Sequence, residues 1–303
     1  MIRFFLILLL CLSVQAGPVV FPGYDAQVIN WNNRSSTNNG GFAGAQNASI
    51  KPSTRLAATE FMRAIRNAGF YPSSTNAGKI MRLNLFAGND FHNGNSDTCL
   101  GAVQTPLISD FGNSLDTTPQ AQATFTYAEQ GSTGGLSGNG AAQLQTGLVA
   151  STTLSSVSNA SFGIYVTVPG LASSTWSMGG QDPSGTGWGL AGPDFSGVGT
   201  RGDCFIVGTA VSDSGGKGFY CVSRQTNTDL YKNGVIFASL SGTTGHLTVQ
   251  DVWVLCLNLN GFRSSASSKT FGGYCIGTTL TSAQQLVLYN TFQRFETCLS
   301  RQQ

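Results

Sequence analysis

The stretch Asp229-Leu-Tyr-Lys-Asn233-Gly234-Val-Ile-Phe237 holds the clearest fold signal in the chain. Asn-Gly between two short apolar runs favours a two-residue type I′ turn, because both central residues of that turn need a positive φ. Such a turn joins two antiparallel strands. On both sides of it, short runs with alternating apolar residues are separated by Gly, Asn or Ser clusters, a pattern typical of further strands. We predict strands at residues 160–168, 203–211, 218–224, 235–240, 247–259 and 271–276.

The spacing and composition of this region predict a mainly β fold. Within residues 160–168 one face is apolar and consists of Phe162, Ile164, Val166 and Val168. The chain has 39 glycines among 303 residues and only 10% charged residues, which is the composition of short strands joined by many turns. Strands repeated at this spacing over residues 122–276 indicate a sandwich or a barrel.

Two helices are expected beside the strands. The first covers residues 53–68, with Ser53 as its N-cap. The second covers residues 282–300, where Thr281 and Gln284 match a capping box. Its apolar stripe has helical spacing and consists of Leu286, Tyr289, Phe292, Phe295 and Leu299. We expect both helices to cover ends or edges of the sheets.

The N-terminus matches a secretory signal peptide. One positive charge at Arg3 precedes an unbroken apolar run over residues 4–12, and small residues lead to a cleavage position after Ala16. A membrane anchor is the alternative, but it needs ~20 apolar residues and this run is far shorter. The Asn- and Gly-rich segment that follows is expected to form an arm or linker outside the core. We therefore predict a secreted protein with a signal peptide at 1–16, an arm at 17–51 and one β-sandwich domain at 52–303.

Charge and hydropathy patterning exclude two kinds of partner. The formal net charge is +2 and no basic run occurs, so the chain shows no nucleic-acid footprint. No second long apolar segment follows the first one. We therefore expect no membrane span after signal cleavage.

Six cysteines follow the predicted cleavage position, and an even number in an exported chain favours disulfides. They are Cys99, Cys204, Cys221, Cys256, Cys275 and Cys298. Hairpin geometry suggests the pairs Cys204–Cys221 and Cys256–Cys275, because cross-strand Cβ atoms lie ~4.5–5.5 Å apart. Cys99 and Cys298 then pair by elimination. The alternative is that the cysteines are buried free thiols.

Several short motifs resemble those of one known family. Leu230-Tyr-Lys-Asn-Gly-Val235 resembles a hairpin of LamG-like, concanavalin A-type jelly rolls, and Phe271-Gly-Gly-Tyr-Cys-Ile-Gly277 resembles the end of such modules. Residues 81–88 and 136–140 resemble a subgroup found in phage virion proteins and bacterial surface proteins. The resemblance covers residues 53–303. It implies a jelly-roll β-sandwich with two peripheral helices, and binding or structural roles more often than catalysis.

The sequence does not match the enzymes that share this kind of fold. Jelly rolls of this type include glucanases, whose Glu-x-Asp-x-x-Glu strand places an acid and a nucleophile on one face. That pattern is absent here. Glu60 and Glu296 fall in the predicted helices, which leaves Glu129 alone among the glutamates. We predict a protein that is not an enzyme, with a glycoside hydrolase as the remaining alternative.

One polar loop has the composition of a calcium site. Asp90, Asn93, Asn95 and Asp97 place four oxygen-bearing side chains in one glycine-containing stretch. Hard cations such as Ca²⁺ prefer oxygen ligands of this kind. An ordinary polar turn with local hydrogen bonds from Asp and Asn is the alternative.

The glycine-rich residues 176–203 are predicted to form a ligand-binding loop. Aromatic faces stack on sugar rings, and nearby carboxylates bond hydroxyl groups. The candidate ligand-binding residues are Trp176, Asp182, Trp188, Asp194 and Phe195. The alternative is that the tryptophans fill the end of the sandwich as core.

The residues and the resemblance together predict a secreted binding module. Its partner would be a glycan or another component of a cell or virion surface. The alternative function is a structural subunit of an extracellular filament, coat or virion. In that case the N-terminal arm would self-assemble by adding a strand to a neighbouring sheet.

Overall fold

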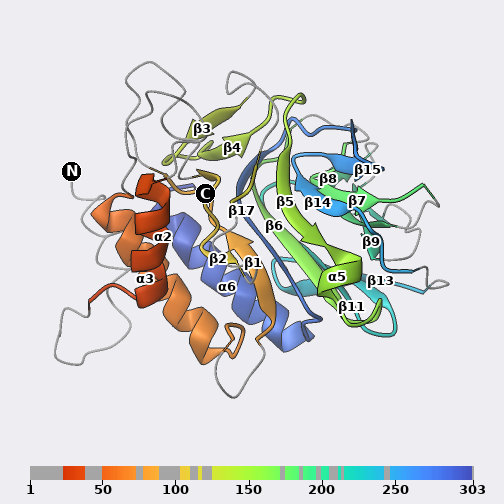
Figure 1. Ribbon diagram of the computed structural model, residues 1–303, viewed down its shortest axis with the longest axis horizontal. Helices are drawn as coiled ribbons and strands as arrows, with labels where there is room; N and C mark the ends of the chain where they lie inside the picture. The colour runs from red at the N-terminus through yellow and green to blue at the C-terminus, as the bar shows by residue number, and fades with distance from the viewer. Residues whose placement is uncertain are drawn as a thin grey trace.

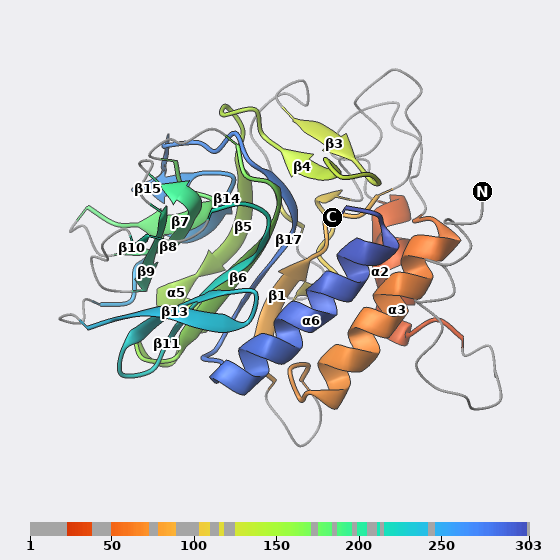
Figure 2. The same ribbon diagram turned by 180° about the vertical axis from the view of Figure 1, so that it is seen from behind.

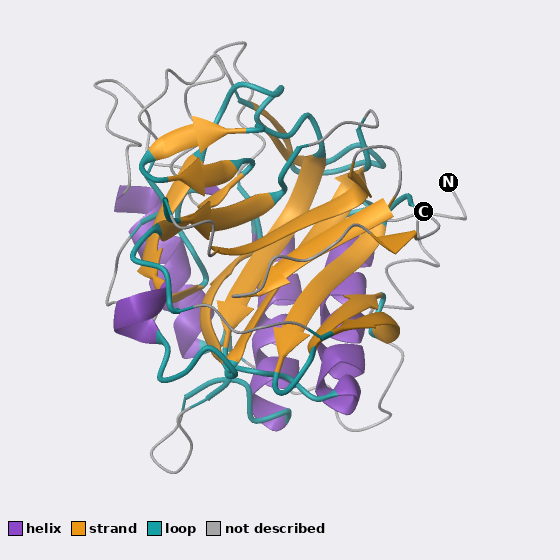
Figure 3. Ribbon diagram, turned by 90° about the vertical axis from the view of Figure 1, so that its right-hand side faces the viewer, coloured by secondary structure: helices purple, strands orange, loops and turns teal. Residues whose placement is uncertain are grey.

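A computed structural model describes residues 23–37, 50–72, 78–88, 103–109, 115–117, 125–170, 175–183, 187–195, 199–204, 211–212, 215–241 and 246–301. These residues form two β-sheets stacked face to face, and helices cover the outer side of one sheet (Figure 1). The view in Figure 3 looks through the strands toward the helices behind them. The predicted fold class, a mainly β sandwich with peripheral helices, is confirmed.

The helix-covered sheet has nine strands among the described residues and is antiparallel. Its main path runs in the order β13 (Val235–Leu240), β12 (Thr228–Lys232), β11 (Gly218–Arg224), β6 (Ala160–Val168), β17 (Thr270–Gly277), β1 (Ile80–Asn84) and β2 (Ile108–Ser109). Two short strands attach to it, β3 (Thr126–Ala128) and β4 (Gly135–Ser137).

The second sheet has eight strands in the described part of the chain. Its main path is β10 (Val211–Ser212), β9 (Gly199–Cys204), β8 (Gly187–Phe195), β7 (Met178–Gln181), β14 (Asp251–Val254) and β5 (Leu144–Val149). The hairpin of β15 (Leu257–Leu259) and β16 (Phe262–Ser264) joins this sheet, because β15 pairs in parallel with β7. A short helix, α5 (Ala150–Thr153), follows β5.

The main core lies between the two sheets. Phe162, Ile164 and Val166 of β6 point into it, as their alternation in the sequence predicts. From the facing sheet, Met178 and Val254 complete the same cluster. Each fully buried side chain of this size stabilises the fold by about 1.5–3 kcal/mol relative to exposure.

A second apolar layer lies on the outer face of the nine-stranded sheet. α6 (Ser282–Cys298) crosses this face, and α3 (Pro52–Asn67) packs beside it (Figure 2). The Phe292 ring stacks on Phe219 of β11 at 5.0 Å between centroids, and Phe61 of α3 meets it edge-on at 5.2 Å. The helices therefore pack on the face of this sheet, because its aromatic side chains point outward toward them. The prediction that they cover ends or edges of the sheets is wrong.

The ends of the two helices differ from the predictions in detail. The Thr281 and Gln284 capping box of α6 is present as predicted. Its buried stripe is rotated, since Leu286 is 45% exposed and Leu288 is buried instead. α3 begins at Pro52 with no side-chain cap, so Ser53 is not the N-cap.

Part of the predicted N-terminal arm belongs to the core. α2 (Ala26–Thr37) packs on α3, and both Val28 and Trp31 are fully buried. The indole Nε1 of Trp31 donates a hydrogen bond of 2.8 Å to the carbonyl oxygen of Thr105. An arm outside the core is therefore wrong for this segment. The predicted signal peptide at 1–16 lies outside the described residues.

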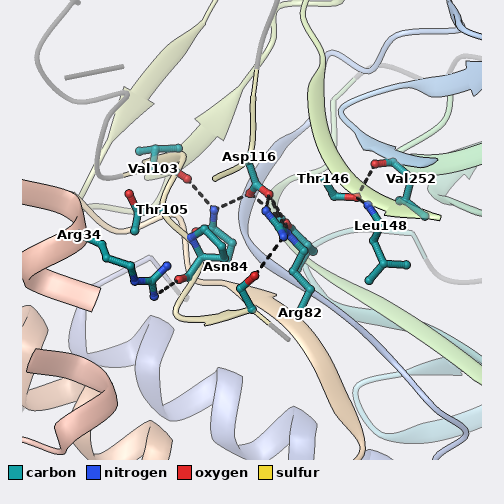
Figure 4. Close-up of polar contacts among 12 residues, drawn as sticks. Arg34, Arg82, Asn84, Val103, Thr105, Asp116, Thr146, Leu148 and Val252 are labelled. Atoms are coloured by element: carbon teal, nitrogen blue, oxygen red, sulfur yellow. Dashed lines mark hydrogen bonds and ion pairs between the residues drawn. The ribbon is translucent and has the colours of Figure 1, made fainter. Parts of the chain in front are cut away.

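A buried polar network attaches β1 to residues 115–117 (Figure 4). The Arg82 guanidinium forms an ion pair of 2.6 Å with Asp116, and both side chains are fully buried. Asn84 donates to the other carboxylate oxygen at 2.8 Å, and the Tyr274 hydroxyl donates to the same group. Because each charge has a partner, burial of this pair is compatible with a stable fold.

The predicted disulfide pairs Cys204–Cys221 and Cys256–Cys275 are wrong. Cys221, Cys256 and Cys275 are free, buried thiols, as the alternative prediction states. Cys204 lies on β9 of the eight-stranded sheet, whereas Cys221 lies on β11 of the nine-stranded sheet. Cys256 lies between β14 and β15, whereas Cys275 lies on β17, so neither predicted pair shares a hairpin. Burial raises the pKa of the Cys221 and Cys256 thiols to about 12. Cys99 lies outside the described residues, so its predicted pairing with Cys298 stays a prediction.

The described helices include none that is both long and apolar enough to cross a lipid bilayer.

Candidate functional site

Three of the sequence-predicted binding residues, Trp188, Asp194 and Phe195, lie on the strand β8, while Trp176 precedes β7 and Asp182 follows it. β7 and β8 form an antiparallel hairpin in which Met178 is opposite Leu190 and Gln181 is opposite Gly187. β8 then pairs with β9 along its other edge. The prediction of a loop over residues 176–203 is therefore wrong, because most of this segment is extended and paired.

The glycines that suggest a loop are needed by strands that pack very closely. A Cβ atom on Gly189 would lie 2.7 Å from the Trp176 ring, closer than side chains approach. A Cβ atom on Gly202 would overlap Leu230 of the facing sheet. Glycine in a strand interior marks such close approaches, at a cost in chain entropy.

The hairpin separates the predicted residues into two groups. Asp182 begins its turn, and Trp188 lies just after the turn, opposite Gly180. Asp194 and Phe195 lie at the other end of β8. Extended chain between Trp188 and Phe195 spans roughly 20 Å. The two groups therefore lie at opposite ends of β8, and a single site made of all of them stays a prediction.

Trp176 is packed and offers little open surface. The residue is 7% exposed and forms a small apolar cluster with Leu257. Its ring covers Gly189, and the Arg201 guanidinium lies 5.1 Å from the ring centroid. A cation over an aromatic face is attracted to it, which helps to hold both groups in place.

Asp182 holds an exposed histidine at the turn of the β7–β8 hairpin. Its carboxylate oxygen Oδ2 lies 2.7 Å from Nε2 of His246. The Asp182 side chain is 5% exposed, whereas the His246 side chain is 60% exposed. The buried carboxylate fixes the ring through Nε2, so Nδ1 is the nitrogen left to meet a ligand.

The most exposed of the large apolar side chains in the described ranges lies on the β15–β16 hairpin, which pairs with β7. Phe262 is 74% exposed and stands at the tip of the β15–β16 hairpin, opposite Leu259. Leu259 is 40% exposed, and the nearby Val249 is 64% exposed. Exposed apolar patches that are rimmed by polar residues commonly mark sites of interaction.

Backbone and amide groups join the two hairpins. The Asn260 N–H donates to the Gln181 carbonyl oxygen at 2.9 Å, and Leu259 is in register with Gln181. The Gln250 side chain donates to the Asn260 side-chain oxygen at 3.4 Å. We call this surface the hairpin-tip patch and define it as Gln181, Asp182, His246, Val249, Gln250, Leu259, Asn260 and Phe262.

The hairpin-tip patch combines two kinds of contact. The Phe262 ring provides an exposed apolar face that can stack on another flat, partly apolar group. The amides of Gln250 and Asn260 and the imidazole of His246 provide donors and acceptors around it. Such an arrangement can bind a molecule that has both C–H faces and hydroxyl groups.

The sequence contains a signal for this hairpin that our prediction missed. Asn260-Gly261 repeats the Asn-Gly dipeptide of the 233–234 turn, and both pairs adopt positive φ. The strand predicted over residues 247–259 begins late, at Asp251, and is divided into β14 and β15 by Leu255, which has a φ of 76°. The second Asn-Gly turn then exposes Phe262.

The described glutamates do not form a catalytic pair. Glu129 and Glu296 are 2% and 0% exposed, so neither carboxyl group reaches an open surface. Glu60 lies on α3 and pairs with Arg63 at 2.5 Å.

The predicted calcium ligands Asp90, Asn93, Asn95 and Asp97 lie outside the described residues, so that site stays a prediction. Within the described ranges, no three His, Cys, Asp or Glu side chains are grouped to hold a metal ion.

Comparison with known proteins assigns no family to the chain. No protein-family model matches it, and no curated protein matches it. The LamG-like resemblance of its motifs therefore stays a prediction.

Several solved structures are similar at a low level. Domain 4 of AbnA, an extracellular GH43 arabinanase from Geobacillus stearothermophilus in complex with arabinotriose, is 16% identical with a TM-score of 0.49, over 70% of this chain and 98% of that one. A mutant Trypanosoma rangeli sialidase displaying trans-sialidase activity is 10% identical with a TM-score of 0.49, over 80% of this chain and 39% of that one. The CBM40 of Ruminococcus gnavus IT-sialidase, bound to alpha2,3 sialyllactose, is 10% identical with a TM-score of 0.35, over 44% of this chain and 82% of that one. At these values the matches assign neither a family nor a ligand to this chain.

Proposed function

We propose that this chain is a non-catalytic carbohydrate-binding protein that holds a glycan on the hairpin-tip patch. One observation carries the proposal: Phe262 is 74% exposed on the β15–β16 hairpin, whose Asn260 bonds to Gln181, the residue before the histidine-binding Asp182. The exposed Phe262 ring is apolar surface in contact with water, and a bound sugar ring would cover it.

The polar border supports a sugar over a purely apolar ligand. The Asn260 backbone N–H bonds to Gln181 of β7, and the Gln250 amide donates to the Asn260 side-chain oxygen, so these groups have partners before a ligand arrives. His246 is fixed by Asp182 in the same way. Groups that are ordered in the free protein lose less entropy on binding.

The buried glutamates support a role without hydrolysis. A glycoside hydrolase of the usual kind needs two carboxyl groups flanking the scissile bond, about 5–9.5 Å apart and open to substrate. Glu129 and Glu296 are buried. The patch itself contains one carboxylate, Asp182, which is engaged with His246.

Export of the chain is part of the proposal and depends on residues 1–16 alone. Because Cys221, Cys256 and Cys275 are free thiols, disulfide bonds give no support to export. The structural-subunit alternative loses its main motivation as well, since α2 packs into the core of its own chain and is not an extended arm.

A glycan array with the purified protein tests the proposal. We expect wild type to bind a defined set of glycans, and Phe262→Ala to lose roughly tenfold or more in affinity for them, because truncating a central aromatic contact costs about 1–2 kcal/mol or more. Titration calorimetry with the best array ligand gives the dissociation constants. Gln250→Ala is expected to weaken the same ligands less.

Val235→Ala is the matched control, because Val235 is 63% exposed on β13 of the other sheet. It should bind as wild type does. Absence of binding by wild type, or equal binding by wild type and Phe262→Ala, contradicts the proposal. Release of reducing sugar from a bound polysaccharide contradicts its non-catalytic part.

A further inference from the structure

Arg224 is a buried arginine at one end of the sandwich. It is the last residue of β11 and is 1% exposed. Tyr220 and Val222 of the same strand point into the core between the sheets, and alternation places Arg224 on the same face. Its Nη1 donates to the carbonyl oxygen of Cys204 in the facing sheet at 2.6 Å, which confirms that the side chain lies between the sheets.

The Arg224 charge has no carboxylate partner in the described part of the chain. None of the ion pairs there includes it, in contrast to the buried Arg82, which pairs with Asp116. The Nε of Arg224 is buried without a hydrogen-bond partner. A buried cation that keeps neither water nor an anion is strongly unfavourable.

A second unpartnered group lies next to it. Thr228, the first residue of β12, is directly opposite Arg224 in the antiparallel register. Residues in such positions have Cβ atoms ~4.5–5.5 Å apart and point to the same side. Thr228 is fully buried, and its Oγ1 is likewise without a hydrogen-bond partner. The two neighbours therefore present two unused hydrogen-bond donors to one place.

From this pair we infer that Arg224 and Thr228 form a buried binding site for a small inorganic anion of the halide class, with chloride as the probe. The anion would accept from Arg224 Nε and Thr228 Oγ1 and balance the guanidinium charge. Guanidinium groups bind anions with strong, charge-assisted hydrogen bonds. The turn between β11 and β12, residues 225–227, is exposed, so Arg224 and Thr228 each lie one residue from the protein surface along the chain.

Thermal unfolding of the full chain at constant ionic strength tests the site. Sodium chloride replaces sodium gluconate, whose anion is too large to be buried there. A ligand that binds only the folded state raises Tm in a saturable way. We expect saturating chloride to raise the Tm of wild type by roughly 2–4 °C, because a modest binding free energy shifts the Tm of a protein of this size by that much.

Variants separate this site from a general salt effect. Arg224→Met should abolish the chloride dependence, whereas Arg294→Met, which changes an exposed arginine on α6, should keep it. Thr228→Val preserves shape and should raise the half-saturating chloride concentration several-fold. Thr228→Val also tests the site if the Arg224→Met variant does not fold.

A crystal grown in bromide gives an independent measurement. We expect an anomalous peak next to Arg224 Nε and Thr228 Oγ1. The site is refuted by a wild-type Tm that does not respond to chloride, by equal responses in wild type and Thr228→Val, or by density at this position without a bromine signal.

Discussion

Glu296 shows how a single buried residue couples stability to pH. It lies near the end of α6, it is fully buried, and its carboxyl oxygens contact the backbone of Gly272, where a Cβ atom would come within 2.5 Å of them. Burial raises the pKa of Glu296 to about 7, while the Arg301 guanidinium, 3.7 Å away, opposes the shift. Arg301 is itself held by the carbonyl oxygens of Glu129 and Phe86.

The raised pKa gives a signed prediction for Glu296→Gln. Unfolding lets the carboxyl group ionise near its ordinary pKa of about 4.3, so the folded protein loses stability as pH rises from there to about 7. Relative to wild type, the variant should gain on the order of 3 kcal/mol between pH 4 and pH 8. Urea unfolding of both proteins at these two pH values measures the difference. If the stability of the two proteins changes equally with pH, Glu296 is not the cause of the pH dependence of stability.

At the scale of elements, the sequence predicts the helices and strands that are specified by residues close together in the chain. β6, β11 and β13 begin and end where alternation and turn residues place them, and the α6 capping box is a four-residue pattern. The strands β7 and β8 were missed because their glycines serve contacts with residues distant in the chain, such as Gly202 against Leu230. The candidate site was only partly predicted: Asp182 belongs to it, while Phe262 depends on the overlooked turn at Asn260.

The docking of α2 onto α3 is the clearest departure from the predicted elements, and it can be tested with a pair of variants. Trp31→Ala should destabilise the protein by about 3–5 kcal/mol, because it removes a fully buried aromatic side chain and its hydrogen bond to Thr105. Ile29→Ala on the same helix is the control, since Ile29 is 46% exposed. Its cost should stay within about 0.5 kcal/mol. Similar unfolding midpoints for the two variants in urea would contradict a packed α2.

At the scale of the whole molecule, the two sheets have different surroundings. α6 and α3 cover the central part of the outer face of the nine-stranded sheet (Figure 2), while the edge strand β13 keeps exposed side chains. The eight-stranded sheet carries the β15–β16 hairpin, on which Phe262 is exposed. Binding residues in proteins often lie on the connecting segments of a packed scaffold.

Hydroxyl-radical footprinting in the presence of the best array glycan tests this account most directly, because it measures where the ligand lies. Phe262 and Tyr24 are both exposed, at 74% and 36%, and Tyr24 lies just before α2 in the helical layer. We predict that saturating glycan slows oxidation of Phe262 at least several-fold and leaves Tyr24 unchanged. Equal oxidation of Phe262 with and without bound glycan would contradict the account.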